Sequence, residues 1–453
     1  MSVTSRLVEF VLKTTLADCP EPVLAQIRRA TLDTIGCMLA GASEPVAAIV
    51  RQVARAEGGT PLCIVVGTAL RTSPTWAALV NGAAGHAHDF DDTNFALLGH
   101  PSVPLLATAL AGGEAEMADG ATIALAYVIG FEVDAALGKA VNPEHYTRGW
   151  HATTSIGTLG CAAAAARILG LDAGQTRHAL GIAASLASGL KENFGSMTKP
   201  YHAGHAARNG VLAAQLAREG MTSSETALDG RQGYAAAFSG AVLPADVFDR
   251  LGQRWEIVES GIAVKPYPSC ALTHSAIDAL IDLRAAHGLT PDRVARVEVR
   301  VNRVVPDVVR HDRPTSALER KFSMPFCAAV ALARGGVDLG HFADGPVDDD
   351  VRRLMERVTM RPDPAMPEGL EQHAWSQVTV TLTDGRVLAP AMRGARGHPN
   401  DPLDAAALRE KFLACVAPVL SRDDASAIAD QIDHLEDIPD IRALTSRLVG
   451  EKE

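Results

Sequence analysis

Small apolar residues recur with a helical spacing through the first part of the chain, up to about residue 260. Residues 19–41 have a proline near their start and a glycine at their end, which is the order that helices prefer. Ser73 suits an N-cap and Pro74 suits the first helical position of a segment that runs to residue 88. The same helical pattern of small apolar residues recurs in three later segments, residues 151–171, 172–190 and 203–221. Because many of these segments are apolar on nearly every side, we predict a helical domain of several layers.

The pattern changes near residue 265. Residues 294–302 alternate between apolar and polar positions, as a half-buried strand does. Residues 377–390 contain another alternating run, then Asp384-Gly385 and a second apolar run, which together indicate a hairpin. Helical patterns occupy the segments between and after these strands, residues 270–288, 322–336, 347–358 and 405–421.

These patterns predict a mainly α fold with two domains. The larger domain is all-helical and is built from both ends of the chain, residues 1–264 and 403–453. The smaller domain, residues 265–402, is α+β. A length of 453 residues and a hydrophobic content of 47% are enough for two sizeable cores.

The chain carries a formal charge of −11, which argues against nucleic acid or an anionic membrane as the main partner. The seven cysteines are scattered without a C-x-x-C pair, so we expect reduced thiols rather than disulfides, structural zinc or an iron–sulfur cluster. The longest apolar run, residues 121–131, is too short to span a bilayer, and the N-terminal residues lack the apolar region of a signal peptide. We expect a soluble, cytoplasmic protein.

Residues 86–94, with the sequence HAHDFDDTN, crowd two histidines and three aspartates into nine positions. His86 and His88 invite a metal site, and hard cations such as Mg²⁺ would accept the carboxylates. However, Phe90 and Asp91 break the H-x-H-x-D-H pattern of dinuclear metallohydrolases, and the D-x-D-D pattern of terpene cyclases is a weak match. Clustered carboxylates also repel one another, which raises a pKa toward neutrality and suits acid–base chemistry. The remaining alternative is an acidic surface loop at the end of a helix.

Four further polar segments lie between the hydrophobic helices, and each contains a glycine or a proline that fixes a turn. Their candidate residues are His100, His151, Lys199, His202, His205, Lys265, Ser269, Cys270 and His274. A single histidine of this kind is most often structural, but five polar segments in one chain favour a shared cleft. Histidine, lysine and helix N-termini give such a cleft a positive potential, which suits a small di- or tricarboxylate.

A histidine in such a cleft can remove a proton from the carbon next to a carboxylate, and a cation can stabilise the enolate that forms. An aspartic acid or a second histidine can then protonate a leaving hydroxide or return the proton to carbon. Dehydration, decarboxylation and epimerisation all share the first part of this chemistry. The residues alone leave these three outcomes open.

Four motifs, in their order along the chain, resemble the MmgE/PrpD family. They are HDFDDTN followed by GHPS, RGWHATTSIGTLGCAAAAARILGL, NFGSMTKPYHAGHAARNG and KPYPSCALTH. The third motif is long and unusual enough to be specific, and the resemblance covers nearly the whole chain. The family includes 2-methylcitrate dehydratase, cis-aconitate decarboxylase and iminodisuccinate epimerase. It implies a helical domain built from both chain ends, a smaller lid domain, a cleft between them, a homodimer, and chemistry without a metal or an organic cofactor.

Matching the motifs of the family onto this chain selects a set of active-site residues. These are Asp89, Thr93, His100, His151, Lys199 and Lys265, with His202 and His274 in the same motifs as supporting residues. We assign His151 or Lys199 as the base, and His100 with Asp89 as the acid and its orienting partner. The residues that we expect to bind the substrate are Thr93, His202, Lys265, Ser269 and His274.

Two positions depart from the decarboxylase-like members of the family. Those members have a tyrosine where this chain has Phe326, and a histidine where it has Cys270. Losing a phenol and an imidazole should alter a proton donor or a carboxylate contact. We therefore expect a cofactor-independent lyase of the dehydratase type that acts on a small polycarboxylate. The alternatives are an epimerase, a cis-aconitate decarboxylase-like enzyme, a carboxylate-binding protein without catalysis, and a metal-dependent hydrolase.

Overall fold

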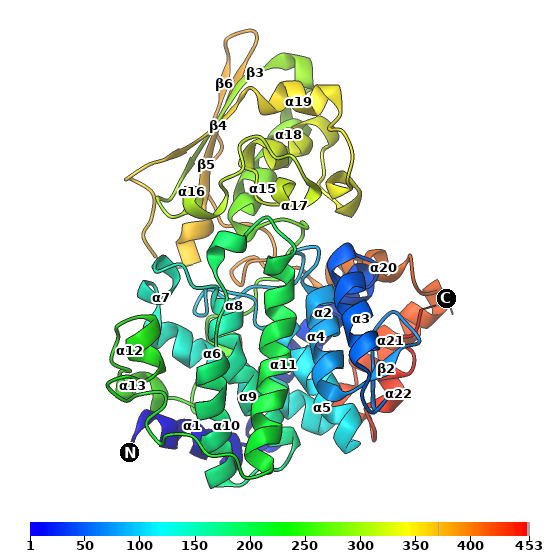
Figure 1. Ribbon diagram of the computed structural model, residues 1–453. Helices are drawn as coiled ribbons and strands as arrows, with labels where there is room; N and C mark the ends of the chain where they lie inside the picture. Colours follow the sequence, from blue (N-terminus) through cyan, green and yellow to red (C-terminus); the bar gives the residue numbers. More distant parts are fainter. Residues whose placement is uncertain (370, 451–453) are drawn as a thin grey trace.

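A large helical part lies below a smaller part that combines helices with a sheet (Figure 1). The computed structural model describes residues 1–369 and 371–450. Helices dominate these residues, so the predicted mainly α fold is confirmed at this level. We call the part from α15 (His274–His287) to β6 (Val387–Leu388) the lid, and the remaining elements the helical body.

The helical body consists of long helices joined by short ones. The long helices are α1 (Val3–Lys13), α2 (Glu21–Gly41), α3 (Pro45–Glu57), α4 (Pro74–Gly85), α5 (Ser102–Glu116), α6 (Gly120–Val141), α9 (Gly157–Ile168), α10 (Ala173–Leu186), α11 (Thr198–Arg218), α20 (Ala405–Val416) and α21 (Arg422–Ile432). The short ones are α7 (Glu144–Thr147), α8 (Ala152–Ser155), α12 (Tyr234–Phe238), α13 (Ala245–Phe248), α14 (Glu256–Glu259) and α22 (Arg442–Thr445), beside a small hairpin of β1 (Cys63–Ile64) and β2 (Arg71–Thr72). Ser73 is the N-cap residue of α4 and Pro74 its first residue, as predicted, although the Ser73 side chain makes no capping hydrogen bond.

Helices α4 and α11 cross at two glycines. A Cβ atom on Gly204 would lie 2.0 Å from the carbonyl oxygen of Leu79, and one on Gly82 would lie 2.6 Å from the Cα atom of Gly204. Only glycine at both positions therefore allows the two backbones to approach this closely. The crossing brings the C-terminal end of α4, where residue 86 follows, against the first turns of α11, which carry residues 199 and 202.

Helix α6 is long and apolar enough to cross a membrane by length and composition, and the bent pair of α2 and α3 passes the same test together. In the protein, however, 89% of the apolar window of α6 is buried. It packs against α9 and α5 in the centre of the helical body. Burial in the core thus accounts for its composition.

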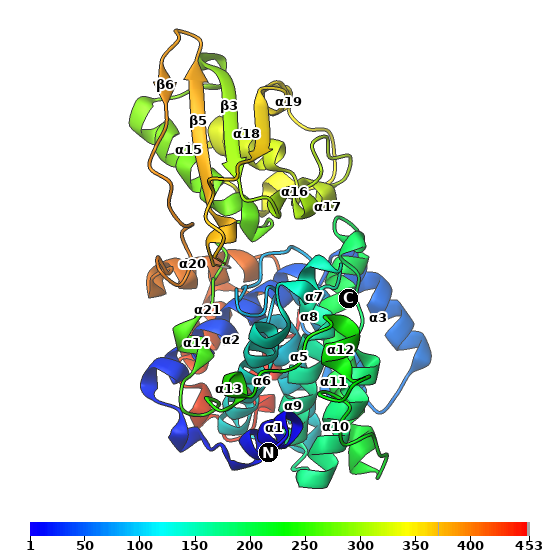
Figure 2. The same ribbon diagram turned by 90° about the vertical axis from the view of Figure 1, so that its left-hand side faces the viewer.

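The C-terminal helices return to the helical body. Helix α20 packs against α2, and Figure 2 shows α20 and α21 beside α2. One hydrophobic core accordingly contains residues from both ends of the chain, from Val3 to Val264 and from Leu408 to Leu448. The boundaries at residues 264/265 and 402/403 stay predictions.

The lid is built on a four-stranded sheet with the order β4-β3-β5-β6. Strand β3 (Val294–Val301) pairs parallel with β4 (Val358–Pro362) and antiparallel with β5 (Ser376–Leu382), and β5 pairs antiparallel with β6. The alternation seen in the sequence places Val378, Val380 and Leu382 in the lid core. The predicted hairpin at Asp384-Gly385 is confirmed, with Gly385 at a φ of 86°.

Helices α15 and α18 (Met324–Arg334) pack against each other and against this sheet, and α19 (Asp349–Met355) packs on α18. Two short helices, α16 (Val305–Val308) and α17 (Ala317–Arg320), lie at the end of the lid that faces the helical body (Figure 1). The 3₁₀ turn η3 (Ala271–Thr273) leads into α15. Residues 263–275 therefore pass from the helical body into the lid, and Ala263 pairs with Thr93 in the loop between α4 and α5.

Candidate active site

A cleft of about 860 Å³, which includes space open to solvent, lies between the helical body and the lid. The helical body lines it with the loop between α4 and α5, the residue before α8 and the first turn of α11. The segment that leads into the lid contributes Lys265, Cys270 and η3, and the lid itself contributes α16 and the residue Phe322. All five polar segments of the sequence thus line one hollow, as the shared-cleft prediction requires.

The acidic stretch is buried, which contradicts the alternative of an acidic surface loop. The exposed fractions of Asp89 and Asp91 are 3% and 0%. The stretch is fixed by backbone hydrogen bonds in both directions between Thr93 and Ala263, and by the ammonium group of Lys411, which donates to the carbonyl oxygen of Phe90 at 2.7 Å. These contacts hold the loop between the body and the start of the lid.

Asp89 is the centre of charge in the cleft. Its backbone adopts a left-handed conformation with a φ of 52°, which is uncommon outside glycine and typical of functional sites. The ammonium groups of Lys199 and Lys265 each donate to Asp89 Oδ1 at 2.9 Å, and Lys265 also donates to the Asp89 carbonyl oxygen at 2.7 Å. Burial alone would raise the pKa of Asp89, but the two lysines hold it well below its usual value.

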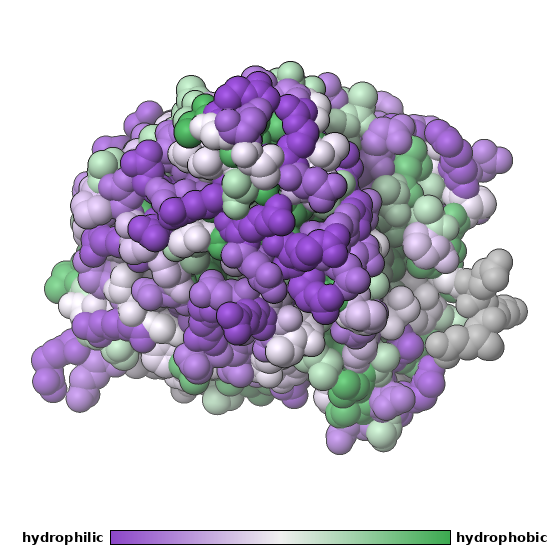
Figure 3. Space-filling model, turned by 90° about the horizontal axis from the view of Figure 1, so that it is seen from above, coloured by the Kyte–Doolittle hydropathy of each residue, from purple (hydrophilic) through white to green (hydrophobic). Residues whose placement is uncertain are grey.

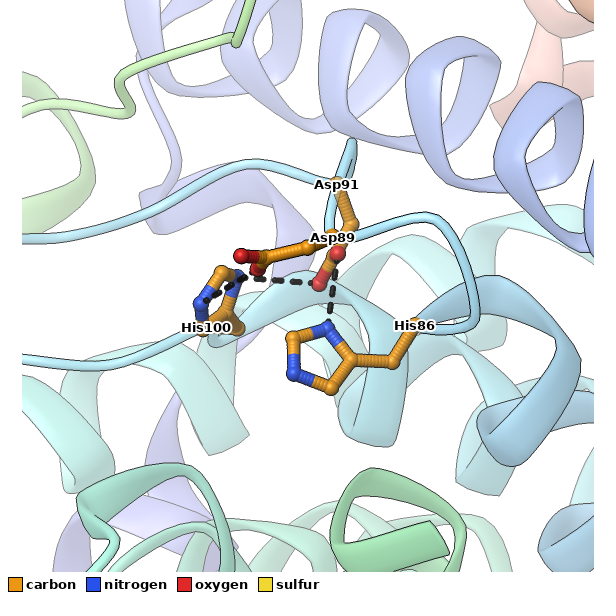
Figure 4. A group of neighbouring side chains, drawn as sticks. All are labelled: His86, Asp89, Asp91 and His100. Carbon is orange, nitrogen blue, oxygen red and sulfur yellow. Dashed lines mark hydrogen bonds and ion pairs between the residues drawn. The ribbon is translucent and has the colours of Figure 1, made fainter. Parts of the chain in front are cut away.

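His86 and His100 flank a second carboxylate, Asp91 (Figure 4). The Nδ1–H group of His86 donates to Asp91 Oδ1 at 2.8 Å, and Nδ1 of His100 lies 3.1 Å from Asp91 Oδ2. The other nitrogen of His100 lies 3.5 Å from Asp89 Oδ1. Burial lowers the pKa of His86, and it lowers the pKa of His100 to about 3 although Asp91 opposes the change. Both rings are therefore neutral near pH 7.

One carboxyl group of the acidic stretch, that of Asp92, has a raised pKa, but burial rather than crowding within the stretch is the main cause. Burial and the nearby Asp33 raise its pKa to about 8. Asp92 contacts the Ser102 hydroxyl and is absent from the lining of the cleft. Asp91 behaves in the opposite way, because His86 and His100 outweigh burial and hold its pKa well below the usual value.

His151 and His202 form a buried pair on the body side of the cleft. Their Nδ1 atoms lie 3.0 Å apart, so Nε2 is the nitrogen of His151 that remains available to the cleft. The rings of Phe194 and His151 pack edge to face, with 4.9 Å between their centroids. Burial, together with the charge of Lys199, holds the pKa of His151 well below its usual value. His151 is therefore a neutral imidazole that needs no deprotonation before it accepts a proton.

Four of these residues have the right atoms for a metal site: ligand atoms of His86, Asp89, Asp91 and His100 lie within 4.8 Å of one another. Two of their ligand atoms are already engaged, however. Lys199 donates to His86 Nε2 at 2.7 Å as well as to Asp89 Oδ1. A divalent cation bound through these two atoms would have to displace an ammonium group from each. The arrangement fits two lysine ammonium groups better than it fits a metal ion.

Family models match nearly the whole chain. The model of the MmgE/PrpD N-terminal domain matches residues 5–244, and that of the MmgE/PrpD C-terminal domain matches residues 267–437. The chain belongs to the MmgE/PrpD family. The resemblance drawn from the four motifs is confirmed.

The relatives within the MmgE/PrpD family include cis-aconitate decarboxylases. The human enzyme is 32% identical over 94% of this chain and 90% of its own length, and the Mus musculus enzyme is 31% identical over 94% and 89%. A cis-aconitate decarboxylase-like protein of Aspergillus oryzae is 27% identical over 99% of this chain and 98% of its own length. These relationships make the protein a lyase of the MmgE/PrpD family.

Six residues that the MmgE/PrpD motifs select line the cleft together. They are Asp89, Thr93, His100, His151, Lys199 and Lys265. Two buried oxygens among them, Asp89 Oδ2 and Thr93 Oγ1, have no hydrogen-bond partner within the protein. Buried polar atoms are normally paired, so these two are ready to contact a bound molecule.

Three other predicted substrate ligands, His202, Ser269 and His274, are absent from the lining of the cleft. His202 is bonded to His151. The hydroxyl of Ser269 is bonded to that of Thr273 at 2.9 Å, and His274 Nε2 donates to the carbonyl oxygen of Ser269 at 3.1 Å. His202 contacts the His151 ring, whereas Ser269 and His274 shape the turn that carries Lys265 and Cys270.

The two departures from the family pattern also lie in different places. Cys270 lines the cleft, and burial raises the pKa of its thiol to about 11. Phe326 is buried in the lid, where its ring packs on Phe342 at 5.5 Å between centroids. The expectation that Phe326 alters a cleft contact is therefore wrong, because this position of α18 faces the lid core.

The sequence did not reveal the contacts of three further residues at the site, His86, Asp91 and Lys321. His86 and Asp91 were visible within the acidic stretch, but nothing in the spacing showed that they bridge Lys199 and His100. Lys321 had no sequence signal. Its buried ammonium group donates to the carbonyl oxygens of His88 and Pro268, at 2.9 and 3.2 Å, and burial lowers its pKa to about 8. It ties the lid to the loop that carries Asp89.

Proposed function

We propose that the protein is a cofactor-independent lyase that acts on a small di- or tricarboxylate by proton transfer at a carbon next to a carboxylate. One observation carries this proposal: the neutral ring of His151 lines the same buried cleft as two ammonium groups, those of Lys199 and Lys265. A neutral base and fixed cations are the two components that enolate chemistry requires. Two relatives are named cis-aconitate decarboxylases, and these names support the same substrate class.

Each cleft residue has a role in this proposal. Lys199 and Lys265 bind substrate carboxylates and stabilise the negative charge that develops on the enolate. The Thr93 hydroxyl donates to a carboxylate oxygen. His151 exchanges a proton with the substrate carbon through Nε2, while Asp89 keeps the two ammonium groups in place. An incoming carboxylate offsets their positive charge, which lets His100 take up a proton and serve as the acid.

Decarboxylation of an unsaturated acid such as cis-aconitate is the reaction that the relatives favour. The bond between carboxyl carbon and the adjacent carbon breaks, CO₂ leaves, and the electron pair enters the conjugated system as a dienolate. Protonation of carbon then completes the reaction. This route needs cations and a proton donor but no base.

Dehydration of a hydroxy acid is the second candidate and the one that the sequence alone favoured. The specific observation behind it is the combination of a neutral His151 with a second histidine, His100, in one cleft. One ring removes the proton from carbon and the other protonates the departing hydroxide. Decarboxylation would use the proton donor but leave the base without a role.

Incubation with cis-aconitate and with citrate-like hydroxy acids distinguishes the two reactions. Release of CO₂ identifies decarboxylation, and a new conjugated double bond without CO₂ identifies dehydration. We expect His100→Ala, which removes the proton donor, to abolish either activity, and His151→Ala, which removes the base, to abolish dehydration. We expect His205→Ala, on α11, to keep the activity, and EDTA to have no effect. No turnover of any of these acids by the wild-type protein, or equal turnover by His100→Ala, would refute the proposal.

We also propose that the protein is a cytoplasmic homodimer. All seven cysteines are free and buried, which suits a reducing compartment. Helix α3 exposes Ile49 and Val53, at 50% and 47%, beside a core cluster that includes Val46 and Val50. Light scattering coupled to size-exclusion chromatography tests the dimer, and a monomer at micromolar concentration would contradict it.

A further inference from the structure

The cleft contains fewer cations than a tricarboxylate has carboxylates. Among the described residues that line it, the charged side chains are Asp89, Lys199 and Lys265. Both ammonium groups lie 2.9 Å from the same oxygen of Asp89, which already neutralises one of their two charges. The histidines of the lining, His100 and His151, are neutral. Lys199 and Lys265, which are the fixed cations among the described lining residues, therefore pair with at most two carboxylates.

The lid side of the cleft is apolar. Val304 and Val308 line it at α16, Leu272 lines it at η3, and Phe322 adds an aromatic ring. The exposed fractions of Val308 and Phe322 are both 3%. We call these four residues the apolar wall.

The two arginines that flank α16 in the sequence form ion pairs outside the cleft. Arg303 forms an ion pair with Glu368 at 3.4 Å, and Arg310 forms one with Glu192 at 3.2 Å. Neither arginine lines the cleft. The upper face of the molecule, seen from above the lid, is mostly hydrophilic (Figure 3). The apolar wall is therefore a local property of the cleft rather than of the lid as a whole.

We propose that the substrate is a dicarboxylic acid with an apolar substituent: its two carboxylates bind at Lys199 and Lys265, and its substituent packs on the apolar wall. This inference deepens the proposed function and rests on it. Each buried methylene group strengthens binding by about fourfold. A third carboxylate in the same position would lose its hydration without gaining a cation, which weakens binding.

Two unreactive acids of matched shape test this with the full-length protein. They are 2-isobutylsuccinate and propane-1,2,3-tricarboxylate, in which an isopropyl group of the first corresponds to a carboxylate of the second. Titration calorimetry measures both dissociation constants, with succinate as the reference. We expect 2-isobutylsuccinate to bind at least about tenfold more tightly than either of the others. Equal or tighter binding of the tricarboxylate would overturn the inference.

A substitution at the apolar wall provides a second test. Val304 is only partly buried, so Val304→Lys adds a cation at the wall without filling the core. We expect this variant to reverse the preference in favour of the tricarboxylate, and Val304→Leu to retain the wild-type preference. An unchanged preference in Val304→Lys would overturn the assignment of the wall.

The inference and the proposed function fail in distinguishable ways. A protein that turns over unsaturated or hydroxy acids but binds the tricarboxylate more tightly keeps the function and loses the inference. A protein that binds neither 2-isobutylsuccinate nor the tricarboxylate, and turns over no acid, loses both.

Discussion

The Nδ1 atoms of His151 and His202 lie 3.0 Å apart, so one ring must donate a hydrogen and the other must accept it. Burial lowers both pKa values, that of His202 to about 4, so each neutral ring carries a single N–H group. If the hydrogen belongs to His151, its Nε2 atom presents a lone pair to the cleft. We infer that His202 selects the tautomer in which His151 is a base.

Substitution of His202 should therefore impair chemistry more than substrate binding. We expect His202→Ala to lower kcat by about tenfold to a hundredfold, with little change in KM, because the tautomer of His151 is no longer fixed. His202→Asn should retain more activity, since its amide oxygen can accept the same hydrogen. His205→Ala is the matched control, because His205 lies one turn later on α11 and contacts Tyr201 and Asn209 instead. A loss confined to KM would contradict the assigned role.

Asp89 should be as important for stability as for activity. Asp89→Asn leaves the buried ammonium groups of Lys199 and Lys265 without their counter-charge, and we expect it to cost about 3–5 kcal/mol of unfolding free energy. Asp363→Asn is a suitable control, because it removes an exposed ion pair with Arg300 and should barely move the denaturation midpoint. Urea denaturation of both variants measures the difference. If the two variants had equal midpoints, Lys199 and Lys265 would have found other partners, which would contradict the prediction.

The pH dependence follows from the lowered pKa values of the histidines. A histidine base loses activity as the pH falls through its pKa, and the pKa of His151 lies well below 6.5 while that of His100 is about 3. We therefore expect that protonation of His151 and His100 does not lower kcat/KM between about pH 7.5 and about pH 5.5. Ring NMR signals, assigned by comparison with His151→Asn, follow the titration without any substrate. A midpoint of His151 near 6.5 would contradict this prediction.

The periodicity of the sequence was enough to find most helices and the hairpin of the lid, because those elements follow local rules. It did not reveal that residues 151–171 form two helices, α8 and α9. The division follows Ser155, whose hydroxyl is hydrogen-bonded to His145 Nε2 at 2.8 Å. It also placed the start of α11 too late, at residue 203, whereas the helix begins at Thr198 and carries Lys199 in its first turn. Tertiary contacts decide both points.

The sequence indicated one shared cleft correctly, but it could not show which polar residues face it. Phe322 and Phe326 illustrate the reason. Phe322 precedes α18 and lines the cleft, whereas Phe326 lies inside α18 and faces Phe342 in the lid core. The positions differ by four residues, and only the packing of α18 against its neighbours separates them. The same holds for Ser269 and His274, whose hydrogen bonds lie within their own turn.

The crossing of α4 and α11 links the core to the site, and a single methyl group tests that link. In Gly204→Ala the new Cβ atom would meet the Leu79 carbonyl oxygen at 2.0 Å, so the two helices must move apart. We expect a loss of about 1–3 kcal/mol in unfolding free energy. We also expect a fall in kcat, because His86 follows α4 and lies 2.7 Å from Lys199 on α11.

Gly112→Ala is the matched control for this crossing. Gly112 also lies inside a buried helix, α5, but its Cβ atom would meet only side-chain atoms of Ile168, at 3.4 Å, which is an ordinary contact. Because the helix backbones need not shift, Gly112→Ala should keep both kcat and the denaturation midpoint close to wild type. If Gly204→Ala behaved in the same way, the spacing of α4 and α11 would not control the distance between His86 and Lys199. A loss of stability with unchanged kcat would separate the core from the site and contradict the proposed link.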